Sequence, residues 1–169
     1  MKKVSIWCDA SQRRVEQTDL NPKGRKVSFA AWVADTGHYW YDLIWAKPSR
    51  DAEITAVFVA LYWALHEGYQ TINIYTDDKS IPESLYGKHK GKGMGDLPVL
   101  IGESTAEINI KFIPRGKNQA AHRLCDEAFA YYSNLGKMPR GGKKTRSYIT
   151  CEAIAKAKKQ GKIRSVVSY

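Results

Sequence analysis

The stretch from Val4 to Ser11, VSIWCDAS, constrains the fold most, because it brings a carboxylate to the end of an apolar strand. Apolar residues recur at every second position, the period of a β-strand with one buried face: Val4, Ile6 and Cys8. Removing the Asp9 carboxylate from water costs several kcal/mol unless a cation or hydrogen-bond donors compensate. Two interpretations of Asp9 are open: it caps the following turn, or it binds a cation.

The length and composition predict one globular domain in a reducing compartment. A chain of 169 residues, 43% of them hydrophobic, has the size of a single domain with a real core. No apolar run approaches the roughly 20 residues of a membrane span, and Asp9 comes too early for a signal peptide. Three scattered cysteines, Cys8, Cys125 and Cys151, favour neither a disulfide framework nor a zinc site. We therefore expect a cytoplasmic protein with no membrane partner.

The positive charge is concentrated in the last part of the chain. Residues 136–169 contain ten Lys and Arg residues and one acid, Glu152, and so account for nine of the ten net positive charges. Such a segment attracts polyanions, although simple solvation would also explain it. We predict a domain at residues 1–135 and a basic extension at 136–169, made of a Gly-rich linker and a short helix.

The pattern of elements predicts an α/β fold. We expect strands at residues 4–11, 27–35, 38–45, 71–76 and 108–113, and helices at residues 52–67, 80–86, 97–104 and 118–135. A short Thr36-Gly37 turn makes the first three strands an antiparallel meander. The fourth strand follows a helical crossover, which favours a parallel arrangement with an earlier strand. Residues 12–26 are predicted to be a loop, and residues 87–96 a flexible loop rich in Gly and Lys.

Three acids occupy related positions in this pattern. Asp9 ends the first strand, Asp77 ends the fourth, and Glu53 is expected in the first turn of the long helix. Each alone has a structural explanation, since acids favour helix N-termini and cap turns. If the two strands are parallel neighbours, however, both Asp side chains leave the same edge of the sheet. Hard oxygen ligands so arranged suit two Mg²⁺ ions about 4 Å apart, which activate a water and stabilise a leaving oxygen.

Four blocks of sequence, in this order, resemble the signature blocks of the ribonuclease H family: IWCDAS, DAEITAVFVALYWAL, INIYTDDKS and IPRGKNQAAHRLCDEAFA. The resemblance covers roughly residues 3–135. It implies a five-stranded mixed sheet of order 3-2-1-4-5 flanked by helices. It also implies a Mg²⁺-dependent endonuclease that cleaves the RNA strand of RNA–DNA hybrids and leaves 5′-phosphate and 3′-hydroxyl ends. By motif, Asp9, Glu53 and Asp77 match the first three metal-binding acids of the family.

The fourth block departs from the family pattern of Asn, three residues, then Asp. Four residues after Asn118 the chain has His122, a variation that some ribonuclease H-like sequences share. An imidazole can ligate a metal, but Mg²⁺ prefers oxygen, so His122 favours Mn²⁺ or acts as a proton carrier. Asp126 lies one turn later on the same helix face and is the alternative. We assign His122 to the fourth position, with two structural alternatives: a polar residue near a helix start and, for Asp126, a surface acid.

Two smaller departures concern the substrate. Ala10 replaces the Gly that often follows the first Asp, and residues 49–51 (SRD) replace an amide-rich approach that often contacts substrate sugars. The sequence therefore predicts the type of reaction more firmly than it predicts selectivity for RNA–DNA hybrids. Five basic residues are candidates for phosphate contact, three in a loop where many family members carry a basic protrusion and two before the last helix: Lys88, Lys90, Lys92, Arg115 and Lys117.

Two other functions remain open at this point. The same fold serves DNA-directed nucleases of the resolvase or transposase type, because a fold does not fix its substrate. A non-catalytic nucleic-acid-binding module with a degenerate site would also explain the missing fourth acid and the basic extension. A proofreading exonuclease is disfavoured, because Asp9-Ala10-Ser11 lacks the second acid of its usual Asp-x-Glu. All readings share nucleic acid as the partner and need no small-molecule cofactor, and none predicts an oligomeric state.

Overall fold

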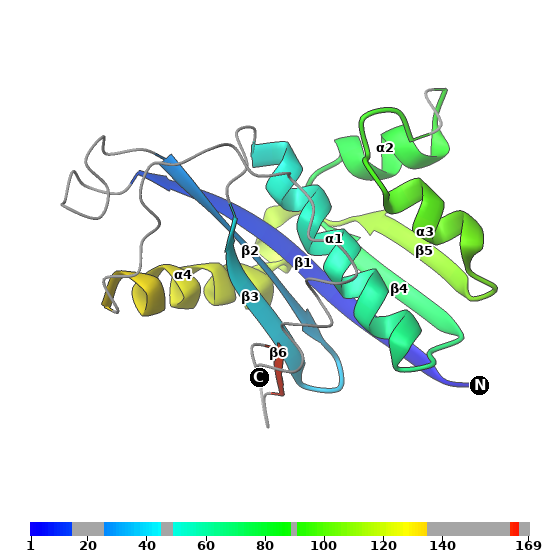
Figure 1. Cartoon of the computed structure of the whole chain (residues 1–169), viewed down its shortest axis with the longest axis horizontal. Helices are drawn as coiled ribbons and strands as arrows, with labels where there is room; N and C mark the ends of the chain where they lie inside the picture. Colours follow the sequence, from blue (N-terminus) through cyan, green and yellow to red (C-terminus); the bar gives the residue numbers. More distant parts are fainter. Residues whose placement is uncertain (15–25, 45–48, 89–90, 135–162, 166–169) are drawn as a thin grey trace.

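The computed structural model of the chain describes residues 1–14, 26–44, 49–88, 91–134 and 163–165 (Figure 1). These form one sheet of order β5-β4-β1-β2-β3-β6. The strands are β1 Lys3–Arg14, β2 Lys26–Ala34, β3 His38–Ile44, β4 Thr71–Thr76, β5 Glu107–Phe112 and β6 Ile163–Ser165. The predicted order 3-2-1-4-5 is confirmed, with β6 added antiparallel to the outer strand β3.

Helices cover both faces of the sheet (Figure 1). They are α1 Ser49–His66, α2 Ser80–Tyr86, α3 Leu97–Glu103 and α4 Gln119–Asn134, and a 3₁₀ turn η1 occupies Arg115–Lys117. On β1 the apolar residues Ile6 and Cys8 belong to the large core beneath α1, whereas Trp7 packs with Leu124 of α4 on the other face. The alternation in VSIWCDAS therefore places Asp9 on the α4 face. None of the described helices has the length and apolar character to span a membrane.

The sequence predicts one buried face for the long helix α1, formed by Ile54, Val57, Leu61 and Leu65 at helical spacing, but more than that face is buried. It begins at Ser49, three residues earlier than expected, and nearly every residue from Ala52 to Ala64 is buried. The sheet lies on one side of α1, and α3 contacts another. Trp63 packs on Trp32 of β2, with ring centroids 4.6 Å apart. The helix is thus a rigid inner element, which fixes the side chains of its first turns.

Strand β1 is longer than predicted. The polar residues 12–14 were expected in a loop, but they continue the pairing with β2 as far as Arg14 opposite Lys26. Backbone hydrogen bonds form the ladder whatever the side chains are, so polarity alone did not end the strand. Pairing with β4, in contrast, ends at Cys8 opposite Thr76. Asp9 therefore lies within β1 but just beyond the end of its parallel pairing.

Residues 91–96 of the Gly/Lys segment that precedes α3 are anchored to the core. Met94 is fully buried in the core, and its backbone N–H donates to the carbonyl of Gly91. Gly91 has φ +84°, and a Cβ there would lie 2.6 Å from the side chain of Pro98. Backbone of this kind is open to glycine and closed to most other residues. The predicted linker and C-terminal helix at 136–160 lie outside the described residues, so that domain boundary stays a prediction.

Candidate metal centre

The parallel register of β1 and β4 brings Asp9 and Asp77 together. Because Cys8 pairs with Thr76, the next residue on each strand leaves the sheet at the same edge. Asp9 is 3% exposed, and Asp77 is partly buried. The register between β1 and β4 therefore brings together two acids that are 68 positions apart in the chain.

The third carboxylate comes from α1. Glu53 lies in the second turn of that helix, not the first as predicted, because the helix begins earlier. Its Oε1 accepts a hydrogen bond of 3.1 Å from the backbone N–H of Ala10, the residue after Asp9. Its Oε2 is buried and has no hydrogen-bond partner among the described residues. Asp9, Glu53 and Asp77 each offer an oxygen within 4.8 Å of the others.

The electrostatics of this cluster show that it is short of positive charge. Burial, followed by the charge of Asp77, raises the pKa of Asp9 to about 6, although the contact with His122 opposes this. Burial and the two neighbouring acids raise the pKa of Glu53 well above its usual range. Burial also raises the pKa of Asp77, with Arg115 as the main opposing charge. A cation bound between these three acids would stabilise their charged forms and so lower their pKa values.

The two adjacent acids of the Asp77-Asp78 pair have different roles. Asp78 Oδ1 accepts hydrogen bonds from the backbone N–H and the hydroxyl of Ser80, at 2.9 and 2.6 Å. This is the contact that stabilises the first turn of a helix, here α2. Asp78 is therefore committed to a structural contact, and Asp77 alone of the pair joins the cluster.

The structure brings His122 to the cluster and keeps Asp126 further out. His122 Nδ1 lies 3.1 Å from Asp9 Oδ2. Asp126 lies on the outer side of the imidazole, with its Oδ2 3.8 Å from His122 Nε2, and its other oxygen pairs with the guanidinium of Arg13. The Asp126 side chain is 49% exposed. Of the two candidates for the fourth position, His122 is thus the one that contacts the cluster, through Asp9. Among the described residues, the group whose ligand atoms lie within 4.8 Å of one another is Asp9, Glu53 and Asp77, without His122, so its role as a ligand stays a prediction.

Asn118 holds α4 against β1, a role that the sequence analysis did not assign. Its side-chain Nδ2 donates a 2.7 Å hydrogen bond to the carbonyl of Cys8, next to Asp9. Its backbone carbonyl accepts the N–H of His122 at 3.2 Å. The side chain is buried, and its Oδ1 has no partner among the described residues. The available signal for this contact was Asn118 itself, the Asn of the family pattern of Asn, three residues, then Asp.

Of the predicted phosphate-binding residues, Arg115 interacts with the carboxylate cluster. Arg115 and Lys117 are exposed on η1, which follows β5. The positive charge of Arg115 lowers the pKa of Asp77, against the effect of burial. Lys88 and Lys92 are exposed on the segment between α2 and α3. Lys90 lies outside the described residues.

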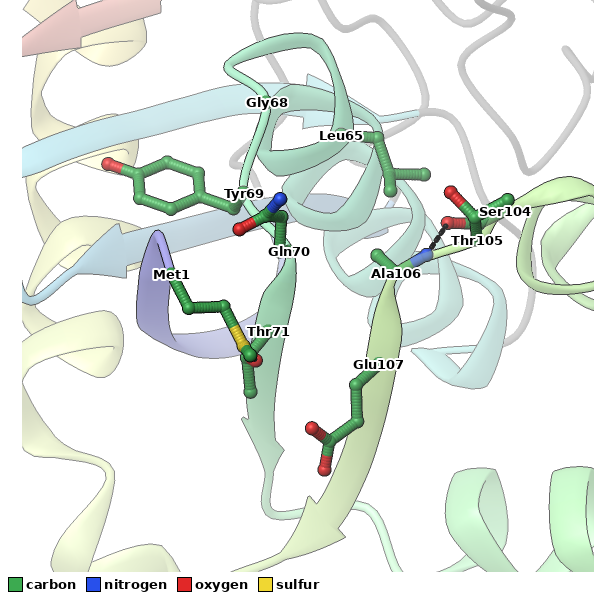
Figure 2. Close-up of a pocket in the computed structure, with 10 residues that line it drawn as sticks. All are labelled: Met1, Leu65, Gly68, Tyr69, Gln70, Thr71, Ser104, Thr105, Ala106 and Glu107. Carbon is green, nitrogen blue, oxygen red and sulfur yellow. Dashed lines mark hydrogen bonds between the residues drawn. The ribbon is translucent and has the colours of Figure 1, made fainter.

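A pocket elsewhere on the molecule is not this site. This pocket has a volume of about 540 Å³. Figure 2 shows the residues that line it, among them Leu65, Tyr69, Thr71 and Glu107. It lies where β4 and β5 begin, whereas Asp77 follows the end of β4. It contains one carboxylate, that of Glu107, and none of the predicted site residues. The pocket and the carboxylate cluster therefore lie at opposite ends of the parallel strands.

Comparisons with known proteins give the chain a family and a fold. Residues 43–128 match a family described as reverse transcriptase-like. The N-terminal RNase H domain of a Mycobacterium tuberculosis protein is similar in structure, with TM-score 0.60 and 18% identity over 80% of this chain and 99% of that chain. RNase H1 of Halobacterium salinarum has TM-score 0.59 and 20% identity, with coverages of 76% and 98%. LC11-RNase H1, in complex with an RNA/DNA hybrid, has TM-score 0.61 and 19% identity, with coverages of 77% and 99%. A comparison with curated proteins gives no match.

Proposed function

Since the chain belongs to the reverse transcriptase-like family and has the ribonuclease H fold, we propose that it is a metal-dependent endonuclease that hydrolyses the RNA strand of RNA–DNA hybrids. One observation carries the proposal: three carboxylates from β1, α1 and the end of β4 offer oxygens within 4.8 Å of one another. Nucleic acid as the partner is supported by the similar LC11-RNase H1, solved with an RNA/DNA hybrid. A foamy viral protease-reverse transcriptase, TM-score 0.55 and 18% identical, was solved with dsDNA.

The donor set fits divalent cations. Carboxylate oxygens are the ligands that Mg²⁺ prefers, and Glu53 Oε2 is buried at the cluster without a partner among the described residues. Asp9, Glu53 and Asp77 would hold the cations, and His122 would complete the site. When bound, two such cations supply an activated water and stabilise the leaving oxygen of an in-line displacement.

The residues of this chain contribute position and charge. The bond from Ala10 N–H orients Glu53, and Asn118 fixes the first turn of α4 beside Asp9. Arg115, which is exposed and interacts electrostatically with Asp77, would contact a phosphate next to the scissile bond. Lys88 and Lys92, with Lys90 between them in the sequence, would contact backbone phosphates further away, because lysine binds phosphate as a point charge. Preference for RNA would come from contacts to the 2′-hydroxyl.

The test is cleavage of four labelled substrates by the whole chain: RNA–DNA hybrid, duplex DNA, duplex RNA and single-stranded RNA, each with Mg²⁺, Mn²⁺ or EDTA. We expect cleavage of the hybrid alone, in the RNA strand, with 5′-phosphate ends and only when a divalent cation is present. Cleavage of duplex DNA in preference to the hybrid would make the protein a DNA-directed nuclease. Hybrid binding without cleavage under every metal condition would make it a binding module and refute the proposal.

A further inference from the structure

A pair of stacked aromatic rings lies on the face of the sheet that carries Asp9. Side chains alternate along a strand, so Trp7 shares this face with Asp9. The parallel register places Tyr75 of β4 beside Trp7, and the two rings stack with their centroids 5.5 Å apart. Tyr75 precedes Asp77 by two residues, as Trp7 precedes Asp9. The aromatic pair is therefore next to the two Asp residues along the same two strands.

Helix α4 covers only one part of this face. Its main contacts are with β1, β2 and β3, whereas the main helix contacts of β4 and β5 are with α1 and α2 (Figure 1). Those two helices lie on the opposite face, because Ile74 of β4, Ile110 of β5 and Ile81 of α2 belong to the core beneath α1. Tyr75, the residue after Ile74, points away from that core. In the described part of the chain, no helix therefore packs mainly on the Tyr75 side of β4 and β5.

The surface left open, here named the aromatic face, consists of residues from three neighbouring strands: Trp7, Asn73, Tyr75, Asn109 and Lys111. Trp7 and Tyr75 are partly exposed, and Lys111, opposite Tyr75 on β5, is exposed. Asn109 Nδ2 donates a 3.2 Å hydrogen bond to Asn73 Oδ1. Aromatic rings, amides and a cation on a flat sheet are the groups with which sheet folds bind unpaired bases and their phosphates.

The charge of the aromatic face becomes more positive toward η1. The exposed acid Glu107 begins β5, whereas Lys111 lies near the end of that strand. The exposed Arg115 and Lys117 follow on η1. A phosphate backbone is therefore favoured at the end of the face that adjoins Asp77.

The metal centre determines which strand passes the aromatic face. In the proposed reaction the scissile phosphate of the RNA strand lies at Asp9 and Asp77, so nucleotides adjoining it in that strand reach Trp7 and Tyr75 first. Bases paired with DNA are stacked inside the duplex and cannot lie on these rings, whereas unpaired bases can.

We propose that the aromatic face binds unpaired nucleotides of the RNA strand, which continue from the hybrid beyond the metal centre. The inference rests on the proposed function, because the metal centre of that function brings the RNA strand to this face. It makes the preferred substrate a hybrid with a single-stranded RNA extension. Rings that only filled the edge of the α4 interface, where Trp7 packs in the cluster that contains Leu124, would give no such preference.

Binding of labelled hybrids to the whole chain in EDTA tests the face without cleavage. An RNA strand extended by about six unpaired nucleotides, a length in the range of known single-strand sites, should bind about tenfold more tightly than a blunt hybrid. The extension is placed at the 5′ or the 3′ end in separate substrates, and one of the two should give the gain. The same extension on the DNA strand should give none. No gain from either RNA end, or an equal gain from the DNA strand, would overturn the proposal.

Two variants connect the gain to the face. Tyr75→Leu should remove most of the gain, because it removes one stacking ring. Lys111→Gln changes an exposed side chain, so it keeps the test open even if Tyr75→Leu unfolds. It should lower the slope of log binding constant against log salt concentration by about 0.7, the value for one phosphate contact on a single strand. The matched controls Tyr86→Leu and Arg123→Gln, at exposed positions of α2 and α4, should leave gain and slope unchanged. A gain that survives in both test variants would refute the assigned residues.

Photo-crosslinking identifies the occupant of the face. With p-benzoylphenylalanine in place of Lys111, the whole chain should crosslink to the RNA extension. A crosslink to a second copy of the chain, or to its own residues 136–169, in place of the RNA would overturn the proposal. Cleavage of blunt and extended hybrids with equal KM, together with equal binding, would refute this inference and leave the nuclease standing. Binding of the extension through Tyr75 and Lys111 without cleavage of any substrate would refute the proposed function and leave the single-strand site standing.

Discussion

The two sides of Asp9 differ in how they are built. On one side, Glu53 comes from a helix and is buried, and Asp77 follows the end of a strand and is partly buried. On the other side, His122 and Asp126 come from one helix, and their side chains are 27% and 49% exposed. The carboxylate side depends on a register and a helix start, whereas the α4 side depends on helical spacing and one buried contact by Asn118.

Because of this difference, charges should interact more strongly on the carboxylate side of Asp9 than on the α4 side. Charges in a buried cluster interact through a low effective dielectric constant, so removing or neutralising one changes the others strongly. A partly exposed imidazole and carboxylate stay solvated, and changing them costs less. We therefore expect changes on the carboxylate side to abolish cleavage of the hybrid. Changes on the α4 side should alter the rate of cleavage and the preferred cation.

The largest effect should come from Asp9, which belongs to both sides. Asp9→Asn should reduce cleavage of the hybrid at least about a thousandfold, or about 4 kcal/mol of transition-state stabilisation, because the cluster loses its central ligand. The matched control is Asp78→Asn, whose side chain can still accept the Ser80 hydrogen bonds that cap α2, and it should keep activity within a few-fold. Initial rates on a labelled hybrid measure both. Equal activity of Asp9→Asn and wild type would refute the assigned site.

A smaller effect is expected on the α4 side. His122→Ala should lower kcat about 10- to 100-fold, and His122→Asp should recover activity with Mg²⁺ more than with Mn²⁺, because Mg²⁺ prefers oxygen ligands. Rates with each cation for the two variants and wild type give the comparison. If His122→Ala costs as much as Asp9→Asn, the two sides are not different in the way proposed.

The buried charge should also appear in the stability of the metal-free protein. The folded state raises the pKa of Asp9 to about 6, above its value in the unfolded chain. Between roughly pH 4 and 6 the folded protein therefore binds a proton that the unfolded chain does not, so this contribution favours folding at low pH and is lost as the pH rises toward 7. Asp9→Asn should then be more stable than wild type at pH 7, by on the order of 1–3 kcal/mol.

Urea unfolding in EDTA at several pH values measures that difference. It should shrink as the pH falls toward 4.5, where the Asp9 carboxyl is protonated in the folded wild type. A difference that is independent of pH, or that grows on acidification, would contradict the raised pKa of Asp9.

Asn118 tests how firmly the α4 side is attached. Asn118→Ala removes the bond to the Cys8 carbonyl and should lower the free energy of unfolding by about 1–3 kcal/mol, because a buried acceptor is left unsatisfied. Gln119→Ala removes an exposed hydrogen bond to the Arg115 carbonyl and should cost less than about 0.5 kcal/mol. Chemical denaturation of both variants makes the comparison. Equal losses would show that the buried contact does not anchor the helix.

The sequence predicted the carboxylate side better than the α4 side, for a physical reason. The alternation in VSIWCDAS and the crossover before TINIYT predict two parallel strands, each followed by or ending in an acid. The register of these two strands, with Cys8 opposite Thr76, then brings Asp9 and Asp77 together. Neither polarity nor period, however, shows that β1 continues to Arg14, because backbone pairing with β2 extends the strand through polar residues. The contact of Arg13 with Asp126 depended on that extension, so the sequence left Asp126 as an alternative to His122 with no partner of its own.

Helix α1 shows a similar limit. Ile54, Val57, Leu61 and Leu65 predicted one buried face, but nearly the whole central part of the helix is buried. Apolar residues occur almost all round this helix, and that pattern is typical of a helix buried on more than one side. The earlier start at Ser49 moved Glu53 into the second turn, where its carboxylate reaches the N–H of Ala10.

The most direct test of the central claim is the binding of Mn²⁺ to wild type, Asp9→Asn and Asp78→Asn, measured by calorimetry without substrate. If Asp9, Glu53 and Asp77 form the cation site, wild type and Asp78→Asn should bind Mn²⁺ with similar affinity, and Asp9→Asn should bind at least about tenfold more weakly, a difference of about 1.4 kcal/mol. Binding of equal strength by Asp9→Asn and wild type would contradict the account.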